Sequence, residues 1–82
     1  MEETRIAVIA VIVEDGTKVS MMNEILHEYA DSIIGRMGIP YRAKNLSLIS
    51  VAVDAPLDTI NALTGKLGKI EGISVKTALS KA

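Results

Sequence analysis

The sequence contains no cysteine and one histidine, and its only aromatic residues are two tyrosines. Without cysteine the chain forms no disulfide and offers no thiolate, which fits a reducing cytoplasm. With a single histidine it supplies, by itself, neither a zinc-binding set nor a Ser-His-Asp or Cys-His arrangement. We therefore expect a cytoplasmic protein that is not an enzyme.

The chain also has almost no excess of either positive or negative charge. The 82-residue chain has a net charge of −1, and its Lys and Arg residues are scattered singly. Nucleic-acid-binding domains usually carry a basic patch, and those that bind single strands add aromatic stacking platforms. Direct nucleic-acid binding by this chain alone is therefore not expected.

Long hydrophobic runs are missing as well. The N-terminal apolar run covers residues 6–13, which is eight residues, and it follows Glu2, Glu3 and Arg5. A membrane-spanning helix needs about 20 apolar residues, and a signal peptide begins with a basic segment. Neither is expected here.

Apolar residues are nevertheless abundant, at 49% of the chain. A small domain has much surface relative to its volume, and a monomer rarely exposes a large apolar patch. We therefore expect part of the apolar surface to be buried against another copy of the chain, in a dimer or tetramer.

The apolar pattern predicts four strands. Residues 4–13 and 46–53 are β-rich and apolar on both faces, which is typical of central strands. Residues 31–41 contain Gly35, Gly38 and Pro40, which favours an edge strand before a polar turn at 42–45. Residues 73–80 alternate apolar and polar, as in a half-buried edge strand.

Two helices are predicted between these strands. Apolar residues at helical spacing indicate one helix over residues 18–30, capped by Asp15 or Thr17. A second helix is expected to begin at the segment 54–56, where Asp54 can cap and Pro is tolerated, and to end near Glu71 before a left-handed Gly72. The order is that of an α+β, ferredoxin-like βαββαβ sandwich, a single domain over residues 1–82, with both helices on one face of a four-stranded antiparallel sheet.

The stretch INALTGKLGKIEGISVK contains two Gly-Lys steps within this second helix. A phosphate-binding loop requires an earlier Gly, where Ile60 stands, and a Ser or Thr after the Lys, where Leu67 stands. The apolar spacing favours a helix instead, so Gly65 and Gly68 mark either a close approach of the backbone or tolerated substitutions.

Candidate binding residues are few. The turn formed by Asp15, Gly16 and Thr17 joins a strand to a helix, and its amide groups are a candidate site for a small effector, although a plain turn and cap explains them as well. His27 is either an ordinary boundary histidine or a ligand for a metal shared between subunits. The sequence predicts no particular cofactor.

The tracts LHEYADSIIGRMGIPYRAKNLSLISVAV and DTINALTGKLGKIEGISVKT resemble the iron-only hydrogenase system regulators. That family is similar to the ACT group of regulatory domains and to the C-terminal sensing domain of the nickel-responsive repressor. The resemblance implies the same ferredoxin-like fold and an oligomeric regulatory module that binds a small effector or a protein partner. In the ACT comparison, Asp15 and Gly16 match the turn that holds the effector.

The resemblance to the nickel-responsive repressor bears on His27. That domain binds nickel through three His and one Cys, and His27 falls at one ligand position, while Gly38, Pro40 and Leu46 occupy the other three. The nickel site is therefore not preserved. The leading hypothesis is a cytoplasmic regulator of the hydrogenase system that assembles through its open sheet face, and the alternative is a metal sensor that uses His27 at a subunit interface.

Overall fold

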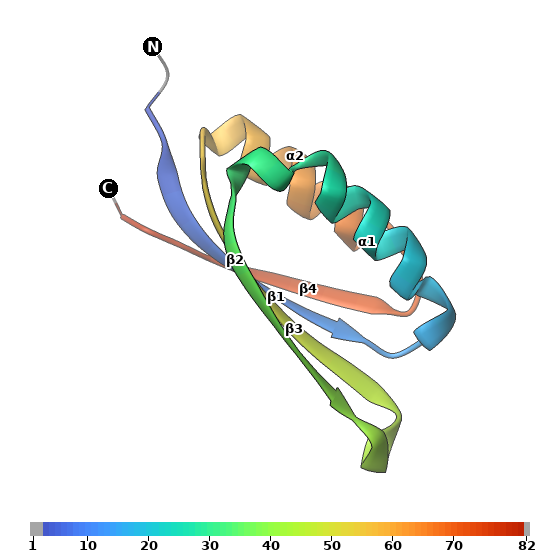
Figure 1. Ribbon diagram of the computed structural model, residues 1–82. Helices are drawn as coiled ribbons and strands as arrows, with labels where there is room; N and C mark the ends of the chain where they lie inside the picture. Colours follow the sequence, from blue (N-terminus) through green and yellow to red (C-terminus); the bar gives the residue numbers. More distant parts are fainter. Residues whose placement is uncertain (1–2, 82) are drawn as a thin grey trace.

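The computed structural model describes residues 3–81, which form one sheet and one layer of helices (Figure 1). The strands are β1 (Arg5–Val13), β2 (Ile33–Tyr41), β3 (Leu46–Ala55) and β4 (Ile73–Leu79). The helices are α1 (Val19–Glu28) and α2 (Leu57–Gly68), and short 3-10 turns lie at Gly16–Lys18, Ala30–Ser32 and Arg42–Lys44. Neither α1 nor α2 is long and apolar enough to cross a membrane.

The sheet has the strand order β2-β3-β1-β4, and every neighbouring pair is antiparallel. Both helices lie on one face, and the hairpin of β2 and β3 extends beyond them (Figure 1). The predicted ferredoxin-like βαββαβ fold is therefore confirmed, with the two apolar strands β1 and β3 in the middle of the sheet.

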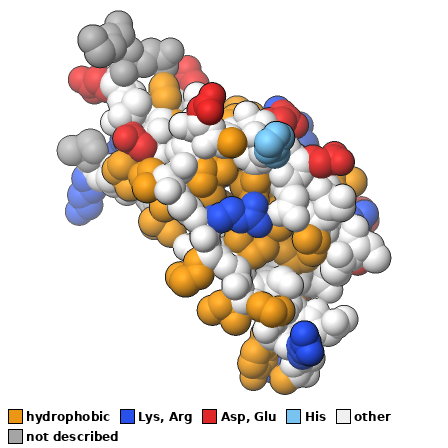
Figure 2. All heavy atoms as spheres, in the orientation of Figure 1, with side chains coloured by type: hydrophobic (Ala, Val, Ile, Leu, Met, Phe, Trp, Pro, Cys, Tyr) orange, Lys and Arg blue, Asp and Glu red, His pale blue; other side chains and the backbone are white. Residues whose placement is uncertain are grey.

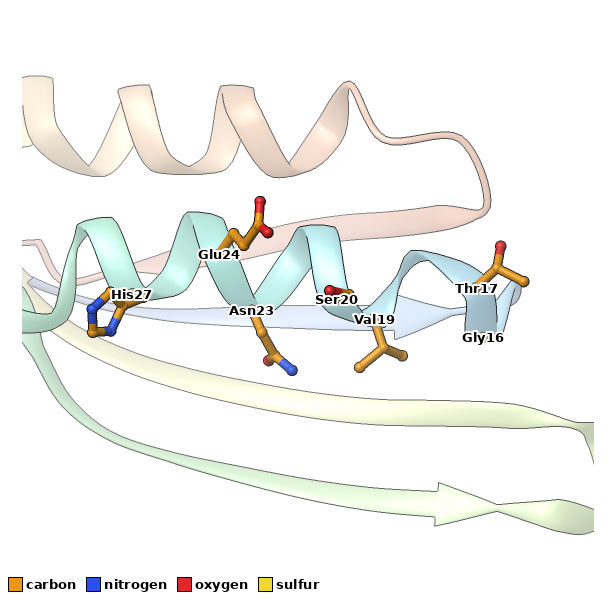
Figure 3. A pocket seen from close by; sticks show the side chains of 7 residues that line it. All are labelled: Gly16, Thr17, Val19, Ser20, Asn23, Glu24 and His27. Atoms are coloured by element: carbon orange, nitrogen blue, oxygen red, sulfur yellow. The ribbon is translucent and has the colours of Figure 1, made fainter.

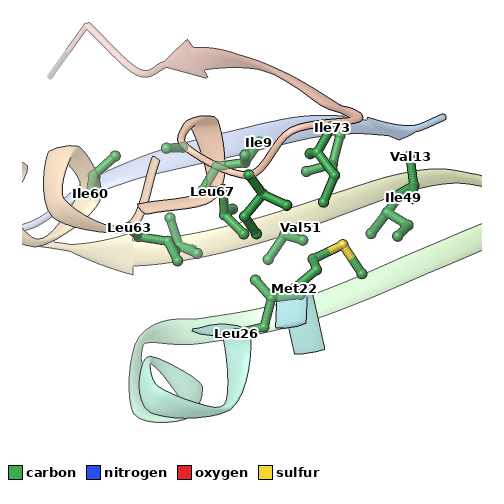
Figure 4. Close-up of a cluster of buried hydrophobic side chains, with 14 of the residues drawn as sticks. Ile9, Val13, Met22, Leu26, Ile49, Val51, Ile60, Leu63, Leu67 and Ile73 are labelled. Carbon is green, nitrogen blue, oxygen red and sulfur yellow. The ribbon is translucent and has the colours of Figure 1, made fainter. Parts of the chain in front are cut away.

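The hydrophobic core lies between the helices and one face of the sheet (Figure 4). Along β1, alternate residues are buried, because successive side chains of a strand point to opposite faces. The helices contribute side chains from their apolar stripes. The most deeply buried large side chains are Ile9, Val11, Val13, Met22, Leu26, Val51, Val53, Ile60, Leu63 and Leu67.

Among residues 3–81, no helix lies against the other face of the sheet, which is apolar at its centre. We call this the open sheet face, and define it by six side chains that are each at least 38% exposed: Ile6, Val8, Ile12, Met37, Ile39 and Leu48. A hollow of about 280 Å³ runs between several of them. Hydrophobic side chains also reach the surface in Figure 2, in the region where Figure 1 places β2 and β3.

The start of the second helix differs from the prediction. Asp54 was expected to cap α2, but it belongs to β3 and pairs with Ile6 of β1. The helix has Pro56 at its N-cap, with no side-chain cap, and Asp58 in its first turn. The prediction was wrong because the sheet ladder continues to Ala55 and keeps the backbone extended there.

The end of that helix also differs. It ends at Gly68 rather than near Glu71, and its last turn tightens, with Ile70 N–H donating to the Leu67 carbonyl at 3.2 Å. Gly72 has a φ of +83°, so the left-handed conformation predicted for this residue is confirmed. An added Cβ on Gly65 or Gly68 would meet open space, so neither glycine serves a close approach.

Candidate functional site

The turn between β1 and α1 is held by its own side chains. The Thr17 amide and the Thr17 hydroxyl both donate to Asp15 Oδ1, at 3.0 and 2.6 Å. The hydroxyl hydrogen bond is the largest of the causes that lower the pKa of Asp15. Hydrogen bonds to the charged form of a carboxyl favour that form. Asp15 therefore acts as the cap of this turn.

The same turn is attached to the segment before β4. The amides of Glu14 and Asp15 donate to the Gly72 carbonyl at 2.7 and 3.3 Å. A Cβ on Gly72 would lie 2.7 Å from the Asp15 Cβ, closer than real side chains approach. Gly72 is thus required both by its positive φ and by the adjoining turn.

These hydrogen bonds use most donors of the predicted effector site. Of the five amides from Asp15 to Val19, four donate within the chain: those of Asp15, Thr17, Lys18 and Val19. An effector at this turn would meet a carboxylate and amides that are already engaged. Effector binding by Asp15, Gly16 and Thr17 stays a prediction.

His27 lies on the exposed side of α1, where the surface is hollowed (Figure 3). The hollow of about 680 Å³ brings Gly16 and Thr17 of the turn onto the same surface as His27. Asp15 is not among the residues that line it. In Figure 3, His27 and Asn23 point to the same side of the helix, toward the strands below it, while Glu24 points away.

The predicted metal role of His27 depends on how many ligands one chain can bring together. Among residues 3–81, no three His, Cys, Asp or Glu side chains are grouped so that they could hold a metal ion. Such a site would need side chains from other copies. Metal binding by His27 therefore stays a prediction about an assembly.

Comparison with known proteins gives the family. A family model described as "TM1266-like: Iron-only hydrogenase system regulator, putative" matches residues 5–77, which is most of the chain. The chain belongs to the TM1266-like family. The family resemblance that the two sequence tracts indicated is confirmed.

A solved structure supports the assignment to the TM1266-like family. The uncharacterized protein TM1266 from Thermotoga maritima is 36% identical to this chain, with a TM-score of 0.91. The match covers 96% of this chain and 100% of that one. No curated protein matches. The TM1266-like family is described by regulation of a hydrogenase system rather than by a reaction, which suggests a non-enzymatic role.

Two polar contacts of this TM1266-like protein did not emerge from its sequence. Lys66 of α2 pairs with Glu28 of α1, with Nζ 3.1 Å from Oε2, and lies 5.1 Å from the centre of the Tyr29 ring. The pKa of Lys66 is raised by these partners, chiefly by the hydrogen bond to Glu28. One of the two Gly-Lys steps thus supplies a contact between helices.

The second contact joins α1 to β2. Arg36 Nη2 donates to Asn23 Oδ1 at 3.0 Å. Arg36 pairs with Val51 across the ladder, so it lies on the helix-facing side of β2. The sequence does show Arg36 as the one charged residue in an otherwise apolar strand, which could have indicated a role for it. Its partner Asn23 could not be predicted, because the two residues meet only through tertiary packing.

Proposed function

We propose that this TM1266-like protein is a small, self-assembling regulatory module of the iron-only hydrogenase system, and that a second copy covers its open sheet face. The family description supports the link to the hydrogenase system. The observation that carries the proposed assembly is the row of exposed Ile6, Val8 and Ile12 in the centre of the sheet. Apolar patches of this kind on small proteins mark interaction sites.

The composition of the open sheet face favours a second copy as the occupant. Its centre is apolar, while Asp54 and Lys76 are exposed charged residues on the two strands that flank β1. An apolar centre with a charged rim is the usual anatomy of a protein interface. In a two-fold dimer the same patch meets itself, so apolar side chains contact apolar side chains and opposite charges can meet at the rim.

Assembly gives such a module a way to respond. An effector shifts the equilibrium between free and assembled chains only by the difference in its affinity for the two states. The turn formed by Asp15, Gly16 and Thr17 is the effector site that the sequence proposes. A partner protein that binds either state would couple to the same equilibrium.

The assembly is tested by the mass of the protein in solution. Static light scattering at micromolar concentration should give a dimer or larger oligomer for the wild type and a monomer for Ile12→Lys, which places a charge in the open sheet face. Met21→Lys is the matched control, since Met21 is similarly exposed, at 48%, but lies on α1. A monomeric wild type would contradict the proposal.

Thermal unfolding gives a second, independent measure. The Tm of the wild type should rise with protein concentration, because assembly stabilises the folded chain by mass action. The Tm of Ile12→Lys should not change with concentration. A wild-type Tm that is constant from low to high micromolar concentration would count against assembly.

The alternative function is metal sensing through His27. It requires that the exposed imidazole meet ligands from other copies, since one chain offers no complete set among its described residues. Calorimetric titration of the wild type and of His27→Ala with nickel, zinc or iron separates the two functions. Absence of binding to the wild-type oligomer would remove the metal-sensing alternative.

A further inference from the structure

A groove separates α1 from β2 on the helix-covered side of the molecule. Its two hollows, of about 260 and 170 Å³, both have Asn23 and Arg36 in their walls. The hydrogen bond between these two side chains therefore crosses the groove where the hollows meet. We call this feature the α1–β2 groove and define it by Met22, Asn23, Leu26, Ile33, Arg36 and Ile49. In Figure 2 a basic side chain lies across a hollow that is surrounded by hydrophobic side chains.

The groove exists because β2 carries little bulk on its helix-facing side. Gly38 pairs with Ile49, which faces the core, so a side chain at position 38 would fill the space under α1. A Cβ there would lie 3.7 Å from Ile49 Cγ1, an ordinary contact. The strand therefore has room for a side chain that the sequence does not supply.

The walls of the groove combine an apolar floor with a small set of polar groups. Met22 and Leu26 of α1 are buried to 0% and 2% exposure. The polar groups are the Arg36 guanidinium, the Asn23 amide and the His27 ring. Ligand sites are commonly built in this way, from apolar walls and a few convergent polar groups.

The charge in the groove is positive. Among residues 3–81, no carboxylate lies within ion-pair distance of Arg36, and the side chain that it contacts there by a hydrogen bond is the neutral Asn23. A guanidinium presents several N–H donors in a planar fork, which matches a carboxylate. Asn23 accepts through its oxygen, so its NH2 group is a second donor beside Arg36.

We propose that the α1–β2 groove binds a small aliphatic monocarboxylate. Arg36 and Asn23 hold the carboxylate, and the apolar hollow next to them holds the short chain. Both hollows are smaller than the roughly 300–1,000 Å³ of sites for drug-sized ligands. A phosphate monoester, with about two negative charges, fits less well, because the groove offers one permanent cation.

This binding site goes beyond the proposed assembly and does not depend on it. The groove lies on the opposite side of the sheet from the open sheet face, so a monomer retains it. Binding can therefore be measured on the wild type and on Ile12→Lys. A monomeric wild type that binds would support the groove and contradict the assembly, whereas an oligomeric wild type that does not bind would do the reverse.

The probe is butyrate, with butyramide as its neutral counterpart of nearly the same shape. Titration followed by ¹H–¹⁵N NMR should show butyrate shifting amide signals of α1 and β2, with binding at least about tenfold tighter than that of butyramide, as expected for a charge-assisted contact. Arg36→Gln should weaken butyrate binding about tenfold or more. Arg42→Gln, on the exposed turn after β2, is the matched control and should bind as the wild type does.

A second variant tests the hollow itself. Gly38→Val should retain a dispersed, folded spectrum and lose butyrate binding, because its side chain occupies the space for the aliphatic chain. Equal binding of butyramide and butyrate would overturn the proposal, and so would unchanged binding by Arg36→Gln. Signals that move only in the turn around Asp15, or no shift with millimolar butyrate, would overturn it as well.

Discussion

The two faces of the central strand β1 carry nearly the same residue types but have different surroundings. Ile9 and Val11 are 0% and 1% exposed beneath the helices, whereas Val8 and Ile12 on the other face are 43% and 41% exposed. Residue type therefore does not decide burial in this sheet. What decides burial is the layer that each face meets, and in the part of the chain that the structure describes, only one face is covered by helices.

The largest expected effect is on the free energy of unfolding, which should fall more for a substitution on the buried face of β1 than for one on its exposed face. Ile9→Ala should lower the free energy of unfolding by about 2–5 kcal/mol, because it removes buried methyl groups and leaves a cavity in the core. Ile12→Ala should cost less than half as much in dilute solution, where its side chain remains partly exposed. Urea denaturation of both variants measures the difference.

Protein concentration sharpens this comparison. If a second copy covers the open sheet face, the cost of Ile12→Ala should grow as concentration rises, while that of Ile9→Ala should stay constant. Equal costs for the two variants in dilute solution would contradict the distinction between the faces.

The face of the sheet that the helices cover also depends on the turns that join those helices to the strands. Substitution of Gly72, which contacts one of these turns, tests how much this connection contributes to stability. Gly72→Ala should destabilise the fold by about 1–3 kcal/mol, because its φ of +83° strains an L-residue and its Cβ would collide with Asp15. Gly65→Ala is the matched control and should stabilise by roughly 1 kcal/mol, since it lies in α2 facing open space. Thermal and urea unfolding report both changes.

A Gly72→Ala variant that is as stable as the wild type, or more stable, would contradict this reading of the turn. It would mean that neither the positive φ of Gly72 nor its contact with Asp15 constrains this position. The comparison is informative because both positions receive the same methyl group.

The sequence predicted the layers of the fold better than the ends of its elements. Apolar residues on both faces of β1 and β3 predicted them to be central strands, and the structure places both in the middle of the sheet. Asp54 was misassigned because capping and strand pairing compete for the same residue, and the ladder partner Ile6 is far away in sequence. Local chemistry could not decide between them.

The candidate sites were less predictable for a related reason. The cap formed by Asp15 and Thr17 is local, and the sequence suggested it. The hydrogen bond between Arg36 and Asn23 joins residues that meet only when α1 packs over the sheet. Contacts within one turn can thus be predicted from the sequence. Contacts between two elements can be identified only once the tertiary structure is known.

The smallest expected effect concerns the turn that leads α1 onto the covered face, and it depends on pH. Because the pKa of Asp15 is lowered below its ordinary value of 3.8, the ionised carboxyl stabilises the fold above that pH. This stability is lost as the pH falls through the lowered pKa. Thr17→Val removes the hydroxyl that is the main cause of the shift, so the pKa of Asp15 should move back toward 3.8.

An NMR titration of the Asp15 carboxyl measures the pKa directly, and acid unfolding below pH 3.8 reports its effect on stability. Thr64→Val is the control, because the Thr64 hydroxyl donates to a neutral backbone carbonyl, that of Asn61. The control should leave the titration of Asp15 unchanged. If Asp15 titrates at the same pH in Thr17→Val as in the wild type, the hydroxyl does not hold its carboxylate, and the anchoring of α1 at this edge would rest on the Thr17 amide and on the contact with Gly72.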